Sequence, residues 1–274
     1  MIPIALTIAG SDPGGGAGIQ ADLKTFHQFG VYGTTAITLI TIQNTTGMSL
    51  VHTLDPSLVG GQIDAVLADL PPMAAKTGAL GTAAIIEAVA ARKVGTPDFP
   101  LVVDPVMIGK HGAPLVDASA RTALRELLIP RAALVTPNLP EAAELAGLPV
   151  HNIDQMKDAA LRIADLGARA VLVKGGHLAG PGFEAETVDI LLHEGVFTEF
   201  RAARINTRHT HGTGCTYSAA ITAELARGTL LEHAVERAKS FVTEAIRSAP
   251  GLGKGSGPLN HHASLRLALG GGAE

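Results

Sequence analysis

The single cysteine of the chain, Cys215, follows two closely spaced glycines, Gly212 and Gly214, and a long helical pattern begins at about Thr216. Backbone N–H groups at the start of a helix attract anions, because they lack intrahelical partners and carry the positive end of the helix dipole. The same field lowers the pKa of a thiol from about 8.5 towards neutrality, so Cys215 could accept a proton from an alcohol. A developing phosphate charge could lie at this helix start, but on the pattern alone a small buried apolar side chain is the favoured interpretation of a single cysteine.

Other polar side chains lie where apolar strands are expected to end. Lys174 ends "VLVK" and could neutralise phosphate oxygens, whereas a lysine there is otherwise a solvated strand end. Asp104 in "LVVDPVM" and Asn138 with Glu141 in "TPNLPEA" offer oxygen ligands of the kind that Mg²⁺ takes beside phosphates and water. Each of these residues also has a purely structural alternative, since Asp104 could cap a turn and Asn138 a helix.

Several other site motifs are excluded by spacing. The first glycine-rich loop contains Gly14 and Gly16, but Ile19 stands where a dinucleotide fingerprint needs its third glycine. The chain has neither a P-loop nor a nucleophile elbow, and its eleven histidines and one cysteine form no usual zinc set. The glycines of the first loop therefore have two interpretations, a tight turn between strand and helix or a contact with a ligand.

These residues need elements that bring them together. Short apolar strand patterns alternate with helical patterns from residue 2 to residue 176, which predicts a mainly parallel sheet covered on both faces. Two strand-like runs meet at residues 193–195 and predict an antiparallel edge hairpin, followed by helices over 216–228 and 231–248. Ligands of such sheets bind beyond the carboxyl ends of the strands, where the polar loops lie. We expect a single domain over residues 1–262 and a mobile tail over 263–274.

Composition narrows the class of partner. The 274 residues are 46% hydrophobic and carry a formal charge of -4, without a basic block and with few aromatic residues. Nucleic acid is not expected as a partner, and no apolar run approaches the roughly 20 residues that a membrane span needs. A small-molecule substrate and a reducing, cytoplasmic location are expected, because one cysteine cannot form an internal disulfide.

Taken together, the segments resemble one family, the hydroxymethylpyrimidine/phosphomethylpyrimidine kinases of thiamine biosynthesis within the ribokinase-like superfamily. Eight blocks match in the family's order and approximate spacing, and together they outweigh the structural alternatives for the single residues. The blocks are "TIAGSDPGGGAGIQADLKTF", "TIQNTTG", "AAKTGAL", "VVDPVM", "VTPNLPEAAEL", "LVKGGH", "THGTGCT" and "GKGSGPLNHH".

The resemblance implies a three-layer α/β/α sandwich with a ribokinase-like fold and with ATP and Mg²⁺ as cofactors. Cys215 would stand where sugar-kinase relatives hold an aspartate base, and Lys174 would neutralise the triphosphate. Asp104 and Glu141 would act on Mg²⁺ directly or through water. The remaining predicted contacts are Gly212, Thr213 and Gly214 in the anion hole, and Thr210, His211 and Asn138 beside ATP.

On the substrate side the resemblance implies that Gln43 reads the aminopyrimidine edge, with Asp22 near the hydroxymethyl group. Gly10, Ala17 and Ala79 are predicted to line the pocket; Ala79 replaces the family's usual methionine and should leave the pocket roomier. The implied activity is ATP-dependent phosphorylation of 4-amino-5-hydroxymethyl-2-methylpyrimidine and then of its monophosphate, by a homodimer. Pyridoxal kinase and a catalytically silent pyrimidine-binding protein are the alternatives.

Overall fold

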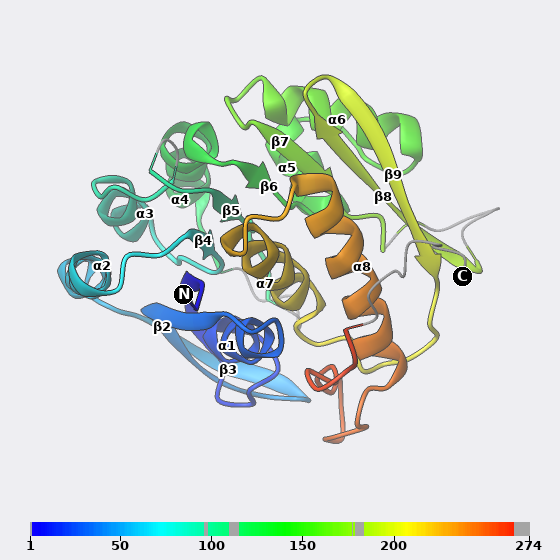
Figure 1. Ribbon diagram of the computed structural model, residues 1–274, viewed down its shortest axis with the longest axis horizontal. Helices are drawn as coiled ribbons and strands as arrows, with labels where there is room; N and C mark the ends of the chain where they lie inside the picture. The colour runs from blue at the N-terminus through cyan, green and yellow to red at the C-terminus, as the bar shows by residue number, and fades with distance from the viewer. Residues whose placement is uncertain (1, 96–97, 110–114, 177, 179–183, 266–274) are drawn as a thin grey trace.

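The computed structural model describes residues 2–95, 98–109, 115–176, 178 and 184–265. Its centre is one sheet in the order β3-β2-β1-β4-β5-β6-β7-β8-β9 (Figure 1). The pairings from β2 through β1 and β4 to β7 are parallel, and those of β2 with β3, β7 with β8 and β8 with β9 are antiparallel. The strands are β1 (Ile4–Ser11), β2 (Tyr32–Asn44), β3 (Gly47–Thr53), β4 (Ala74–Thr77), β5 (Leu101–Val103), β6 (Leu134–Val135), β7 (Ala170–Val173), β8 (Glu186–His193) and β9 (Val196–Ala203).

Helices cover both faces of the sheet and create two hydrophobic cores. Helices α1, α7 and α8 pack on one face, and α2 to α6 pack on the other (Figure 1). Successive strand residues alternate between the cores: Val102 joins the first group of helices, whereas Val103 joins the second. The helices are α1 (Gly18–Gln28), α2 (Pro56–Asp69), α3 (Ala83–Ala90), α4 (Ala118–Ala123), α5 (Leu139–Ala146), α6 (Ile153–Ala164), α7 (Thr213–Ala226) and α8 (Leu231–Arg247), with a π-turn at Leu124–Leu128 and a 3₁₀ turn at Ile129–Arg131.

The three-layer sandwich with a mainly parallel sheet is confirmed, and so is the hairpin at residues 193–195. Glu194 and Gly195 join β8 to β9 with φ angles of 50° and 78°. The second antiparallel edge, β2 with β3, was not predicted. Strand β2 continues to Asn44, so Gln43 lies at the end of this strand.

The glycine-rich segment near the C-terminus is packed against the domain. Ser256 N–H donates to the carbonyl of Thr45 at 2.8 Å, and Ala263 is buried in the core beneath α8. The domain therefore continues at least one residue past the expected boundary at 262. Residues 266–274, most of the expected mobile tail, lie outside the described residues.

Candidate active site

The start of α7 forms the centre of the site. The helix begins at Thr213, three residues before the predicted start, so Thr213, Gly214 and Cys215 form its first turn. Gly212 caps it in the left-handed region, with φ of 82°, and a Cβ there would lie 1.7 Å from the Gly16 carbonyl oxygen. Only glycine fits this approach. The Thr213 N–H donates to the Thr210 carbonyl at 3.4 Å, whereas the N–H groups of Gly214 and Cys215 have no hydrogen-bond partner within the described residues and can bind an anion.

Lys174 and Asp104 converge on this helix start from the ends of β7 and β5. Lys174 Nζ lies 3.0 Å from Asp104 Oδ1, and a Cβ on Gly214 would lie 3.3 Å from Lys174 Nζ. Ser218, one turn along α7, donates to Asp104 Oδ2 at 3.3 Å. Three segments far apart in sequence therefore bring a cation, a carboxylate and the N–H groups of the α7 start close together.

Asn138 and Glu141 cap α5 reciprocally. Asn138 Oδ1 accepts from the Glu141 N–H at 3.0 Å, and Glu141 Oε2 accepts from the Asn138 N–H at 2.8 Å. The helix-capping alternative for Asn138 is thus correct. Burial raises the pKa of Glu141 to about 7; Lys174 lowers it and the Asp104 carboxylate raises it.

The same carboxylates are the candidates for holding Mg²⁺. Within the described residues, no three His, Cys, Asp or Glu side chains cluster as a metal site. Asp104 and Glu141 interact electrostatically with each other and with Lys174, so two carboxylates lie in the same part of the site. That set fits Mg²⁺, which keeps several waters and takes one or two carboxylates beside substrate phosphates.

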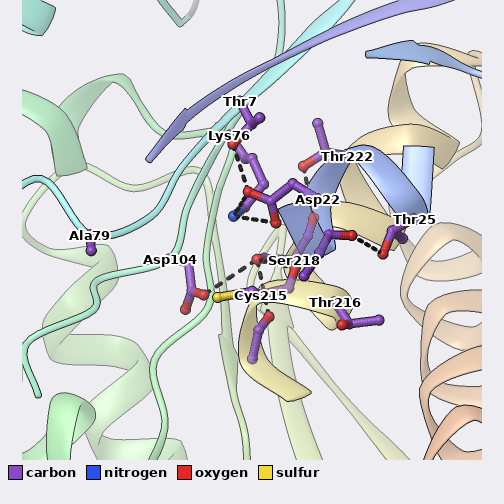
Figure 2. Close-up of polar contacts among 12 residues, drawn as sticks. Thr7, Asp22, Thr25, Lys76, Ala79, Asp104, Cys215, Thr216, Ser218 and Thr222 are labelled. Atoms are coloured by element: carbon purple, nitrogen blue, oxygen red, sulfur yellow. Dashed lines mark hydrogen bonds and ion pairs between the residues drawn. The ribbon is translucent and has the colours of Figure 1, made fainter. Parts of the chain in front are cut away.

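A buried ion pair between Lys76 and Asp22 lies next to this site, and it was not predicted from the sequence. Lys76 on β4 lies 2.9 Å from Asp22 Oδ2, both side chains are 0% exposed, and Thr7 donates to the same oxygen at 2.6 Å. Lys76 Nζ also lies 3.0 Å from Asp22 Oδ1, so both carboxylate oxygens have protein partners, and contact of Asp22 with the substrate stays a prediction. The available signal was a lysine inside the otherwise apolar run "MAAKTG". Figure 2 shows the pair with Cys215 and Asp104 in the same region.

The Cys215 thiol is not acidic here, contrary to the prediction from its place at a helix start. Its pKa is raised to about 11, chiefly by burial; Lys76 and the Gly18 N–H act to lower it, whereas Asp22 and Asp104 act to raise it. The sequence correctly predicted that Cys215 lies at a helix start, where the helix dipole lowers a thiol pKa. It could not predict the burial and the two nearby carboxylates, which raise the pKa by more.

The predicted substrate residues lie on neighbouring segments around this centre. Gln43 is half-buried at the end of β2, where its amide donates to Thr41 at 2.8 Å. Ala79 is half-buried after β4, and its carbonyl accepts from Thr38. Ala17 precedes α1 and is half-buried, while Gly10 is buried against Leu39.

Two of the residues predicted to contact ATP, His211 and Thr210, make hydrogen bonds within the protein. His211 is buried and its Nε2 lies 2.9 Å from Asp12 Oδ2. Thr210 offers its carbonyl to the Thr213 hydroxyl at 2.9 Å. Contact of either residue with ATP stays a prediction.

Comparison with known proteins gives the family. The family model described as phosphomethylpyrimidine kinase matches residues 12–260. The chain belongs to the phosphomethylpyrimidine kinase family. It is 48% identical to the hydroxymethylpyrimidine/phosphomethylpyrimidine kinase of Bacillus subtilis, with 97% of each chain covered. It is 49% identical to the thiamine biosynthesis bifunctional protein ThiED of Geobacter sulfurreducens, covering 93% of this chain but 51% of that longer protein.

Solved structures place this phosphomethylpyrimidine kinase family member among vitamin kinases. A phosphomethylpyrimidine kinase from Clostridium difficile matches with a TM-score of 0.77 and 43% identity, covering 89% of this chain and 99% of that one. The pyridoxal kinase of Staphylococcus aureus in complex with AMP-PCP and pyridoxal matches with a TM-score of 0.85 and 37% identity, covering 96% and 94%. Such ATP-analogue complexes agree with ATP use. No helix in the described part of the chain has the length and hydropathy to cross a membrane.

Proposed function

We propose that the chain transfers the γ-phosphoryl group of ATP to the hydroxymethyl oxygen of 4-amino-5-hydroxymethyl-2-methylpyrimidine, and then phosphorylates the resulting monophosphate. The observation that carries this proposal is the convergence of Lys174, Asp104 and Gly214 at the start of α7. That convergence occurs in a chain 48% identical, over nearly its full length, to a kinase named for both substrates. The ThiED relative, half of which this chain spans, supports a place in thiamine biosynthesis.

The first turn of α7 and Lys174 would stabilise the charge of the transferred group. Phosphoryl transfer depends mainly on positioning and on electrostatic stabilisation of the equatorial oxygens. Free N–H groups of Gly214 and Cys215 supply fixed donors, and Lys174 supplies a cation that Asp104 holds at 3.0 Å. Neither element has to reorganise during the reaction.

Cys215 would accept the proton of the hydroxymethyl group. With a pKa of about 11 its thiol is neutral near pH 7, so it must first release its proton to solvent water when substrate and ATP assemble the site. The thiolate would then take the hydroxymethyl proton as the oxygen bonds to the γ-phosphorus and ADP leaves. Lys76 is the nearby cation that favours the thiolate, while Asp22 and Asp104 oppose it. A thiolate with a high pKa is the stronger base once it forms, which suits an alcohol acceptor.

Mg²⁺ would be held by Asp104 and Glu141, directly or through water, together with the phosphates of ATP. Bound there, the ion would neutralise charge that develops on the β- and γ-phosphate oxygens. Because the pKa of Glu141 is raised to about 7, its carboxyl group is partly protonated near neutral pH. It would lose this proton when it interacts with the cation.

Pyridoxal is the second candidate substrate, because solved pyridoxal kinases match this fold with TM-scores of 0.85. Gln43 favours the aminopyrimidine, since its amide offers both a donor and an acceptor to the ring edge. Ala79 leaves room where the family usually has methionine, which could admit a differently substituted ring.

Substrate competition tests the proposal. Hydroxymethylpyrimidine, its monophosphate and pyridoxal should each be offered with Mg-ATP, and kcat/KM compared. We expect both pyrimidines to be phosphorylated with at least about tenfold higher kcat/KM than pyridoxal, a difference of roughly 1.4 kcal/mol in transition-state stabilisation. Turnover of pyridoxal alone would establish the second candidate, and ligand binding without turnover of any substrate would establish a silent binder.

A homodimer in the cytoplasm is the expected setting. Ile40, Ile42 and Leu50 are 45%, 58% and 46% exposed on the hairpin of β2 with β3, which supports an interface between two copies at this edge. Cytoplasmic location follows from the need for ATP. Ile42→Glu should convert the dimer to a monomer in light-scattering measurements, whereas an unchanged mass would place the interface elsewhere.

A further inference from the structure

The Asp12 carboxylate is the centre of the first glycine-rich loop, residues 11–17. Its Oδ1 accepts from the Gly14 N–H at 2.8 Å, and its Oδ2 accepts from the N–H groups of Gly16 at 3.1 Å and Ala17 at 2.9 Å. Asp12 is 2% exposed. The carboxylate thus replaces water as the partner of three backbone donors and fixes the path of the loop up to α1.

A fourth donor to Asp12 comes from the other end of the chain. His211 Nε2 lies 2.9 Å from Asp12 Oδ2, across 199 residues of sequence. Hydrogen bonds from His211 and from the loop N–H groups lower the pKa of Asp12, although burial alone would raise it. The carboxylate is therefore ionised and can only accept hydrogen bonds, so the Nε2–H of His211 is the donor in this contact.

His211 is itself held tightly between two segments. Its N–H donates to the Gly257 carbonyl at 3.1 Å, and it pairs with Pro258 in a short parallel bridge. On the opposite side, a Cβ on Gly16 would lie 2.7 Å from His211 Cδ2. The ring consequently has little freedom to leave Asp12.

The residue after His211 is Gly212, which caps α7. A Cβ on Gly212 would lie 1.7 Å from the Gly16 carbonyl oxygen, so the two glycine-rich loops are in direct backbone contact. Asp12 binds the Gly16 N–H on one side of this contact, and His211 precedes it on the other. The predicted substrate loop and the anion-binding loop thus share one buried hydrogen-bond centre.

We propose that Asp12 and His211 are positioning residues that lock the first glycine-rich loop onto the start of α7, so that the pyrimidine and phosphate sites are formed together. We call this pair the Asp12–His211 latch. It deepens the proposed function and rests on that function for the ligands involved. Neither side chain needs to contact a ligand, because the latch acts through the backbone of Gly16 and Gly212.

The latch makes a reciprocal prediction. If the loops are positioned by one shared centre, removing the carboxylate must loosen the α7 loop, and removing the imidazole must loosen the first loop. If each residue supported only its own loop, the effects would stay local and would add in the double variant. Reciprocity therefore separates the latch from ordinary local stabilisation.

Hydrogen–deuterium exchange of the ligand-free protein tests this directly. Asp12→Asn should speed exchange in peptides covering residues 205–216, and His211→Leu should speed exchange in peptides covering 11–18. His211→Gln, whose amide can still donate to Asp12, should restore much of the protection that His211→Leu loses. Because no ligand is needed, this readout is independent of which substrate the enzyme phosphorylates.

Binding and kinetics give the second readout. Asp12→Asn should raise the Kd of Mg-AMP-PCP at least about fivefold, the usual lower range of coupling between sites, although Asp12 belongs to the first loop. The double variant Asp12→Asn with His211→Leu should lose no more than the worse single variant. The KM for ATP should rise more than kcat falls, since the anion hole is misplaced and not removed.

The His193–Glu232 pair is the matched control, because it joins β8 to α8 through a similar contact of 2.6 Å away from both loops. His193→Leu should change neither exchange in the two loops nor the Kd of Mg-AMP-PCP. Exchange that rises only in the loop carrying each substitution, or equal behaviour of His211→Leu and His211→Gln, would overturn the latch. If Asp12→Asn does not fold, the two His211 variants decide the question, because they leave the carboxylate in place.

Discussion

Lys76 on β4 and Asp22 on α1 form an ion pair of 2.9 Å in which neither side chain has any exposed surface. Burial by itself lowers the pKa of Lys76, but Asp22, Cys215 and Asp104 together raise it, so the lysine stays charged. A buried charge pair costs desolvation, and replacing both partners by neutral groups is often tolerated. The pair lies close to Cys215 and interacts with it electrostatically, so we expect it to affect the reaction as well as to hold α1 to the sheet (Figure 2).

Lys76→Met alone should destabilise the protein by about 3–5 kcal/mol, because it leaves the Asp22 carboxylate buried without its cation. Lys76→Met combined with Asp22→Asn should recover most of that loss in urea unfolding, yet stay well below the wild type in kcat. Wild-type kcat in the stable double variant would reduce the pair to a structural role. The control is the ion pair between Arg237 on α8 and the buried Glu224 on α7, and Arg237→Met with Glu224→Gln should leave kcat unchanged.

Cys215 should react slowly with iodoacetamide at pH 7 and progressively faster up to about pH 11, since burial raises the pKa of its thiol to about 11. The chain has one cysteine, so mass spectrometry reports this site without further substitutions. A midpoint near pH 7 would show instead that the helix start prevails over desolvation.

Cys215→Ala should fold normally and lose roughly 10²–10⁴ in kcat for phosphorylation of the alcohol, the usual contribution of a positioned base. Phosphorylation of the monophosphate should suffer less, because the second pKa of a phosphate is about 6 and its oxygen is already ionised. The two rates should be measured separately, with ATP binding as the control. Equal losses would assign Cys215 a positional role in place of proton transfer.

Gln43→Leu should weaken pyrimidine binding by about 1–3 kcal/mol, because it leaves polar ring atoms without partners, while the Kd of ATP stays the same. Calorimetric titration with each ligand measures both values. A parallel loss for the two ligands would indicate that Gln43, which donates to Thr41 in the free protein, supports the fold of β2.

His261 should make the protein sensitive to acid. Burial lowers its pKa to about 4, with smaller contributions from Lys24 and His262, against 6.5 in the unfolded chain. Between these values the unfolded chain binds more protons, so stability falls as pH falls from 6.5 to 4 and is flat above. The loss should reach about 2–3 kcal/mol in urea unfolding, and His261→Gln should remove most of it. An identical pH dependence in His261→Gln would show that His261 is protonated in the folded state.

Local patterns in the sequence are enough to predict the layers of the fold and the edge of the sheet that carries the candidate site. Alternating apolar strands and helical patterns require a parallel sheet covered on both faces, and parallel strands deliver Asp104 and Lys174 to the same edge. The glycines before Cys215 indicated the anion-binding helix start in the same way. These features depend on neighbouring residues and on periodic spacing, so they can be recognised in the amino-acid sequence.

The surroundings of each group depend on contacts between segments that are distant in the sequence. The pKa of Cys215 depends on burial and on Lys76, Asp22 and Asp104, which come from three other segments. Asp22 pairs with Lys76, 54 residues away in sequence, and His211 pairs with Asp12, 199 residues away. Pairs at such separations produce no recognisable spacing pattern in the sequence. Desolvation and Coulomb interactions depend on distance in space, and the folded chain alone sets that distance.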